Sequence, residues 1–204
     1  MTRALVLSCA LLAFARPAAA EWHFTPMLGL TMFGNTSLVD LENGTGKRHG
    51  QAGGSVSWLG AGLFGVEGLV TWTPGLFEND DVSFPDANIP FPEEFVKSSR
   101  SIVAMGNLVV TLPRRWTEYG LRPFFSGGFG VMHVMKEDIG IFPVKLNLPA
   151  YNVGGGAVGF FSQRTGVRFD VRFHSTLRRT DEGPAFGPVH MRYVTASIGL
   201  IFRR

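Results

Sequence analysis

The chain of 204 residues has one cysteine and, beyond its first 20 residues, no long apolar run. Cys9 lies in the segment that we expect to be removed, so the remaining chain can form no disulfide. A transmembrane helix needs about 18 or more consecutive apolar residues, which excludes this type of membrane span after residue 20. The sequence also contains no phosphate-binding loop, no cluster of metal ligands and no nucleic-acid-binding module, so we expect no cofactor, no metal and no nucleic-acid partner.

The first 20 residues have the three parts of a secretory signal peptide. Arg3 supplies a positive start, Ala4–Phe14 an apolar core, and Ala18–Ala20 an A-x-A cleavage site before Glu21. We therefore expect a cleaved signal peptide at 1–20 and one domain at 21–204. Cleavage removes two of the 19 basic residues and no acid, which leaves 17 basic against 16 acidic side chains.

The clearest secondary-structure signal is Val167–His174, where apolar and ionisable residues alternate over eight positions. Because successive side chains of a strand point to opposite faces, one face is Val/Phe/Val/Phe and the other Arg/Asp/Arg/His. Such a strand fits a soluble sheet, in which the charged face meets water. It also fits a transmembrane barrel, in which the apolar face meets lipid.

Similar alternation recurs along the chain and predicts eight strands that are long enough to cross a bilayer. The connections alternate in length, which is typical of a barrel with short periplasmic turns and long extracellular loops. A lipocalin-like soluble barrel stays open as the alternative. The expected strands are 21–33, 49–59, 63–72, 100–112, 121–135, 150–161, 167–174 and 190–202, with the loops 34–48, 73–99, 136–149 and 176–189 on the long side.

Aromatic residues lie at the ends of the expected strands, as the two interfaces of a membrane select. We therefore predict an all-β fold, a single eight-stranded antiparallel up-and-down transmembrane β-barrel in the outer membrane of a Gram-negative-type bacterium. The short-turn end carries Trp22, Trp58, Trp116, Tyr119, Phe161 and Phe202, and the long-loop end Phe33, Trp72, Phe77 and Phe173.

Several segments in the second half of the chain resemble the OmpA-like family of small eight-stranded outer-membrane barrels. They are 122–130 (RPFFSGGFG), 152–156 (NVGGG), 166–173 (GVRFDVRF), and 191–193 (MRY) with 199–202 (GLIF). The resemblance implies insertion by the barrel-assembly machinery, which reads a terminal aromatic residue. Phe202 fits that role, although Arg203 and Arg204 follow it here.

In the expected orientation of the strands, a small set of polar side chains points into the lumen. The lumen of an eight-stranded barrel is narrow, and side chains alone fill it. We predict that Glu67 and Asp170 pair with Arg168 and Arg172 in a salt-bridge network that plugs the barrel. A continuous water channel is the alternative. The expected lumen residues are Glu67, Asn107, Arg168, Asp170, Arg172 and His174.

Two further features suggest contacts outside the lumen. Basic residues at the loop ends match the phosphates of lipopolysaccharide, although they are equally typical of solvated loops. The long loop 73–99 contains apolar residues and is the expected surface for an extracellular partner. The candidate lipopolysaccharide contacts are Lys47, Arg48, Lys97, Arg100, Arg178 and Arg179.

These observations favour a structural or surface-interaction role. A small pore or a conduit for a hydrophobic ligand is one alternative, and a lipid A-modifying enzyme is the other. The enzyme hypothesis depends on His174, whose neighbour Ser175 points to the opposite face, so that only Thr176 shares its side of the strand. We therefore expect no enzymatic activity.

Overall fold

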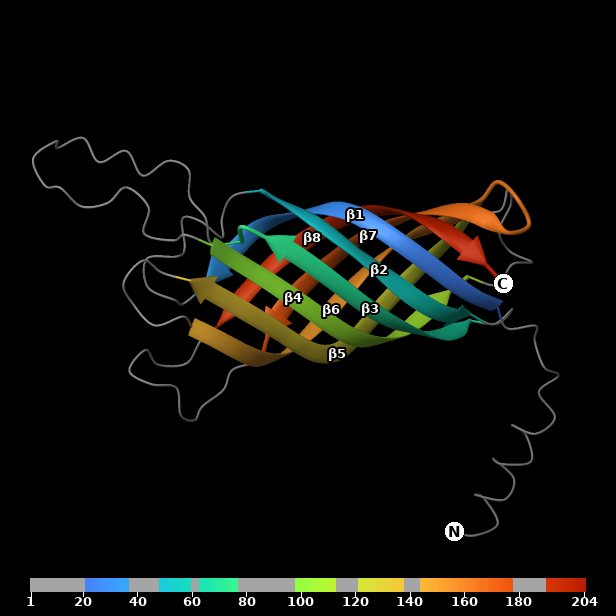
Figure 1. Ribbon diagram of the computed structural model, residues 1–204. Helices are drawn as coiled ribbons and strands as arrows, with labels where there is room; N and C mark the ends of the chain where they lie inside the picture. Colours follow the sequence, from blue (N-terminus) through green and yellow to red (C-terminus); the bar gives the residue numbers. More distant parts are fainter. Residues whose placement is uncertain are drawn as a thin grey trace, which may run out of the picture.

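The computed structural model describes residues 21–36, 48–59, 63–76, 98–112, 121–137, 144–177 and 190–204, which form a closed barrel (Figure 1). Each strand pairs antiparallel with its neighbours in sequence, and β1 closes the barrel on β8. The predicted eight-stranded up-and-down barrel is confirmed. Among the described residues, no helix is long and apolar enough to cross a membrane. The strands are β1 (Glu21–Thr36), β2 (His49–Leu59), β3 (Phe64–Pro74), β4 (Ser98–Thr111), β5 (Leu121–Glu137), β6 (Val144–Phe160), β7 (Thr165–Thr176) and β8 (Met191–Arg203).

The barrel wall turns its buried polar side chains into the lumen, together with apolar ones, and carries large apolar side chains on its outer face. β3 shows the pattern without interruption, since every second residue from Gly65 to Thr73 is buried and every residue between them is exposed. Large apolar side chains on the outer face are among the most exposed of the protein, as for Leu28 at 67% and Phe129 at 70%. An apolar exterior over a hydrogen-bonded closed sheet is what the hydrocarbon of a bilayer requires.

The first residue of β1 and the C-terminus lie at the same end of the barrel (Figure 1). The connections at this short-turn end span residues 60–63, 112–120 and 161–164, and those at the opposite, long-loop end span 37–48, 75–97, 138–143 and 177–190. Described aromatic residues of the short-turn end are exposed on the outer face, namely Trp22, Trp58, Phe161 and Phe202. Trp116, Tyr119 and Phe77 lie outside the described residues.

The loop expected at 136–149 is wrong in its bounds, because β5 continues to Glu137 and β6 begins at Val144. Leu148 is buried inside the barrel while Pro149 faces outward, so the strand alternation continues through the proline. The Pro149 carbonyl accepts a hydrogen bond from the Leu177 N–H at 2.7 Å, on the β7 side. In an antiparallel strand the N–H and C=O of one residue face the same neighbour. The missing N–H of Pro149 therefore faces the end of β7 and leaves the ladder with β5 intact.

β1 also extends beyond its expected end at Phe33 and reaches Thr36. Its register with β8 shifts between Met32 and Asn35, and Phe33 within this irregularity has a positive φ of 55°. A β-bulge inserts an extra residue and re-aims the side chains that follow it. Here the bulge leaves Phe33 73% exposed on the outer face near the long-loop end.

Candidate functional site: a charged layer in the lumen

Five of the six polar residues expected in the lumen meet in one layer, and we call these five the charged layer. Alternation along β7 turns three of them inward, while the other two are direct cross-strand neighbours on β3 and β4. Each of the five is at most 5% exposed. The members are Glu67, Asn107, Arg168, Asp170 and Arg172.

Each arginine of the charged layer bridges both acids. Arg168 Nη1 lies 2.5 Å from Glu67 Oε2, and Arg168 Nη2 lies 2.7 Å from Asp170 Oδ2. Arg172 Nη2 lies 2.6 Å from Glu67 Oε1, and Arg172 Nε lies 2.7 Å from Asp170 Oδ1. Two positive and two negative side chains thus alternate in a closed set with no net charge. Buried charges are tolerated when they are paired and hydrogen-bonded in this manner.

Further contacts surround the two acids and Arg168, and sequence reasoning did not identify Ser57 or Phe124 among them. Asn107 Nδ2 donates to Glu67 Oε1 at 3.0 Å, and the Ser57 hydroxyl donates to Glu67 Oε2 at 3.5 Å. The Arg168 guanidinium lies over the Phe124 ring, 4.3 Å from its centroid, a cation–π geometry. The alternation of β2 indicates that Ser57 points inward. Its hydrogen bond to Glu67, however, depends on the register that places the two residues opposite each other.

Small residues on the adjacent strands make room for the charged side chains of β7. Gly154 lies opposite Arg172, Gly156 opposite Asp170, and Gly199 opposite Arg168. A Cβ added to Gly154 would lie 2.7 Å from both Cα and Cγ of Arg172, closer than real Cβ contacts come. The glycine-rich segment 154–156 therefore leaves space in the lumen for the charged side chains of β7, rather than making the strand flexible.

Two apolar clusters fill the lumen on either side of the charged layer. The inward residues of β4 show the order, since Met105 belongs to one cluster, Asn107 to the charged layer and Val109 to the other cluster. The cluster nearer the short-turn end contains Leu59, Val109, Phe124, Val158 and Ile201. The cluster nearer the long-loop end includes Met27, Leu69, Met105, Met132, Leu148 and Met191.

His174 is the sixth expected lumen residue, and it lies outside the charged layer. Its Nε2 lies 3.4 Å from Thr195 Oγ1, and its ring stacks on Tyr193 at 5.1 Å between centroids. The Ser175 hydroxyl bonds the Thr176 carbonyl, and the Thr176 hydroxyl oxygen accepts the Met191 N–H at 2.9 Å. Within the described residues, no three His, Cys, Asp or Glu side chains gather as a metal site requires.

Only two of the six candidate lipopolysaccharide contacts belong to the described residues. Arg48 and Arg100 are exposed near the long-loop end, and Arg100 Nε donates to the Met135 sulfur at 3.0 Å. Lys47, Lys97, Arg178 and Arg179 lie outside the described residues, as does most of the loop 73–99.

Phe202, the expected assembly signal, points outward at the short-turn end and is 49% exposed. It pairs with Phe24 of β1, and the chain continues past it in register. Arg203 Nη1 then reaches Glu21 Oε2 at 3.2 Å, while the backbone of Arg204 exchanges two hydrogen bonds with Trp22.

No family model and no curated protein matches the sequence, whereas solved structures match the fold. Neisserial surface protein A aligns over 89% of this chain and 97% of its own, with a TM-score of 0.55 and 8% identity. OprG from Pseudomonas aeruginosa covers 92% and 97% of the two chains at a TM-score of 0.56 and 11% identity. The N-terminal barrel of OprF from the same organism covers 89% and 97% at 0.51 and 12% identity. The chain therefore has the fold of the small outer-membrane barrels, as the resemblance implied. Its apolar outer wall independently supports the expected outer-membrane location.

Proposed function

We propose that this chain is an integral outer-membrane barrel with a structural and surface-interaction role, whose lumen is plugged by the charged layer. The observation that carries the proposal is a set of four buried ion pairs, of which the two to Glu67 join β3 to β7 across the lumen and the two to Asp170 lie within β7. Packed apolar clusters lie on both sides of it. A water-filled channel has neither feature, because solvated charges do not need one another.

The energetics of the charged layer also favour a plug over a pore. Removing one partner from a buried ion pair costs about 3–5 kcal/mol, because the other partner keeps its charge without compensation. An ion that crossed this layer would have to break several such contacts and displace the apolar side chains on either side. A hydrophobic ligand would meet the same obstacle, since the charged layer separates the two apolar clusters.

Ion conductance in a planar bilayer tests the plug. We expect the refolded protein to produce no discrete current steps, and addition of gramicidin to the same membrane provides the positive control for detection. Insertion is verified by gel mobility, since a closed barrel that resists detergent migrates faster before boiling than after it. Discrete openings from a correctly inserted protein would overturn the plugged lumen and support the small-pore alternative.

For the surface-interaction role we propose lipopolysaccharide as the partner at the long-loop end. Arg48 and Arg100 are exposed there, and guanidinium groups bind phosphate well. We expect the double variant Arg48→Gln/Arg100→Gln, purified from lipopolysaccharide-containing vesicles, to retain less bound lipopolysaccharide than the wild type. Equal retention would contradict this contact. The loop 73–99 stays the proposed surface for an extracellular partner, and Phe202 the proposed signal for the assembly machinery.

We propose no enzymatic activity for the barrel. Within the described residues, His174 contacts Thr195 and not the hydroxyls of Ser175 or Thr176, so this segment lacks the nucleophile–base pair of a hydrolase. Loss of an acyl chain from lipid A that depended on His174 would refute this proposal.

A further inference from the structure

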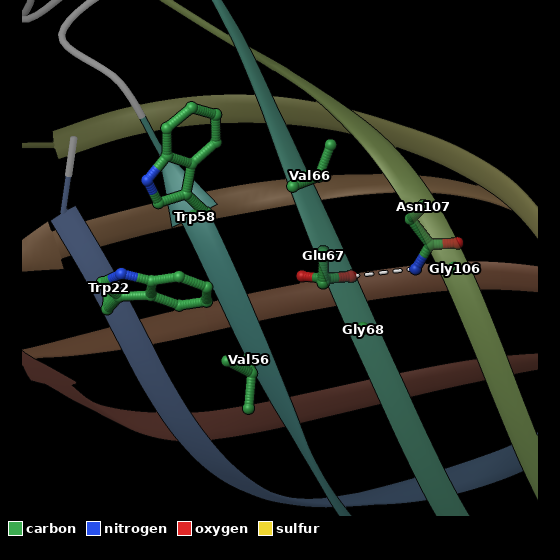
Figure 2. A pocket seen from close by; sticks show the side chains of 8 residues that line it. All are labelled: Trp22, Val56, Trp58, Val66, Glu67, Gly68, Gly106 and Asn107. Atoms are coloured by element: carbon green, nitrogen blue, oxygen red, sulfur yellow. Dashed lines mark hydrogen bonds between the residues drawn. The ribbon is translucent and has the colours of Figure 1, made fainter. Parts of the chain in front are cut away.

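A groove crosses the outer wall near the short-turn end, at the place where two glycines lie side by side. Gly68 of β3 and Gly106 of β4 are direct cross-strand neighbours on the outer face. A Cβ on Gly68 would touch nothing within 4 Å, so the groove is open to the exterior. Its volume is about 510 Å³, and Figure 2 shows its walls, formed by Trp22, Trp58, Val56 and Val66.

A second, basic hollow lies at the short-turn end and has a volume of about 560 Å³. The charged side chains of its lining are three arginines and one acid, and these side chains sum to +2. The Arg203 guanidinium already has partners within the protein, because it forms an ion pair with Glu21 at 3.2 Å and lies over the Phe160 ring. Arg164 and Arg204 are exposed, and neither forms an ion pair with another described residue. The lining residues are Glu21, Gln163, Arg164, Arg203 and Arg204.

The two hollows adjoin where β1 begins: Glu21 lines the basic hollow, and Trp22, which points to the opposite face of the strand, lines the apolar groove. Their link on the outer face is Arg204. Arg204 is tied to this junction by backbone hydrogen bonds to Trp22 at 3.0 and 3.2 Å. From there Trp22 pairs with Trp58, and Trp58 with Val66, so the groove continues around the wall from Arg204. Arg204 and the apolar groove are thus contiguous on the outer face, and Arg164 lines the same basic hollow as Arg204.

The height of this junction in the membrane follows from its aromatic residues. Trp22, Trp58 and Phe202 are exposed on the outer face at the short-turn end, and such side chains mark the boundary between hydrocarbon and headgroups. The apolar groove therefore lies at the depth of acyl chains. Arg164 and Arg204 lie at the depth of lipid phosphates, where arginine binds anionic headgroups.

We propose that the junction is a binding site for one anionic phospholipid of the leaflet at the short-turn end. Arg164 and Arg204 hold the phosphate, and one acyl chain occupies the groove over Gly68 and Gly106. Charge complementarity selects an anionic headgroup, since arginine side chains outnumber acidic ones by three to one in the basic hollow. Continuity with the apolar wall selects a lipid as the occupant, because the groove opens directly onto the surface that lipid covers.

The test measures lipid bound to the protein by native mass spectrometry, after purification from vesicles that contain phosphatidylglycerol and phosphatidylcholine in equal amounts. We expect one retained phosphatidylglycerol and little phosphatidylcholine. Arg164→Gln/Arg204→Gln is expected to lower retention at least tenfold, because it removes both arginines that hold the phosphate and the loss of one charge-assisted hydrogen bond already accounts for a factor of about ten. Arg192→Gln, which removes an exposed arginine near the long-loop end, is the matched control and should retain the wild-type level.

The groove is tested separately by filling it. Gly68→Leu places a side chain in the groove, and we expect it to lower retention by about the same factor as the arginine variant. Gly50→Leu is the control, because Gly50 is also exposed on the outer face and a Cβ there would touch nothing within 4 Å. Gel mobility before and after boiling verifies that each variant has folded.

Four results would overturn the proposal. Equal retention of the two lipids, or equal loss in Arg192→Gln, would show that the arginines do not select a headgroup. Displacement by inorganic phosphate, together with no effect of Gly68→Leu, would assign the basic hollow to a free anion. A dimer that Gly68→Leu dissociates would assign the groove to a second copy of this chain.

Discussion

Two consecutive residues of β3, Glu67 and Gly68, lie on opposite faces of the wall and in opposite surroundings. Glu67 points into the lumen, is 3% exposed, and contacts Arg168, Arg172 and Asn107. At Gly68 an added Cβ would touch nothing within 4 Å. The two faces of this one strand therefore have to meet different requirements. The inner face has to satisfy charges and fill a narrow space, whereas the outer face has only to be apolar.

This contrast predicts that stability depends on the identity of inward side chains far more than on that of outward ones. Residues of both faces have cross-strand neighbours, but an inward side chain can also contact side chains from across the lumen, as Glu67 contacts Arg168 and Arg172. Outward residues have lipid as their neighbour, and lipid adapts to whatever apolar shape is present. The following substitutions test the contrast in order of decreasing effect.

The largest effect is expected for Glu67→Gln, which removes the anion that both arginines share. Arg168 and Arg172 would keep Asp170 as their only anionic partner in the charged layer. We expect a loss of about 3–5 kcal/mol in the free energy of unfolding, the cost of leaving a buried charge without its partner. The measurement is equilibrium unfolding by urea in lipid vesicles, with gel mobility reporting the folded fraction.

Gly68→Ala is the control on the adjacent, outward position and should stay within about 0.5 kcal/mol of the wild type. The double variant Glu67→Gln/Arg168→Gln should recover part of the loss, because it removes one charge of each sign. Equal unfolding of Glu67→Gln and Gly68→Ala would mean that the lumen charges are solvated, and would favour a water channel.

The sequence predicted the strand pattern better than the contacts within the lumen. Alternation alone turned Arg168, Asp170 and Arg172 to one face, because a strand has a period of two residues. It placed Glu67 and Asn107 on the same side by the same argument. The partners of these residues depend on which residues of neighbouring strands lie opposite each other, and the alternation within one strand does not determine this register. Ser57 reaches Glu67 only because β2 and β3 pair with these two residues opposite each other.

The sequence also did not predict the start of β6 or the groove on the outer wall. The predicted loop 136–149 ended at Pro149, but this proline lies within β6, where its missing N–H faces the end of β7 rather than the ladder with β5. Gly68 and Gly106 are 38 positions apart in the sequence and form one groove only because β3 and β4 pair. Closure of the barrel, rather than any local pattern, decides such long-range neighbours.

A smaller effect is expected for Gly154→Ala, which adds one methyl group on the inner face. Its Cβ would lie 2.7 Å from Arg172 Cα and would also clash with the Val171 carbonyl oxygen. Neither backbone atom can move without shifting β7, so we expect a loss of about 1–3 kcal/mol, the usual cost of overpacking. The same urea titration measures it.

Gly50→Ala provides the outward counterpart of this glycine substitution, since a Cβ at Gly50 would touch nothing within 4 Å. We expect its unfolding midpoint to match that of the wild type. Should both alanine variants unfold alike, the inward glycines would not be needed to accommodate the β7 arginines, and the space argument would fail.

The smallest effect is expected for Ser57→Ala, which removes the longest hydrogen bond to Glu67. At 3.5 Å this bond lies at the limit of useful geometry, so its loss should cost about 0.5 kcal/mol, the low end for a buried hydrogen bond. Ser126→Ala is the matched control, because Ser126 is also 1% exposed but its hydroxyl has no hydrogen-bond partner within the described residues. Removing an unpaired hydroxyl should leave stability unchanged or raise it slightly. If Ser126→Ala proved the more harmful of the two, packing volume rather than polar contacts to Glu67 would govern the inner face.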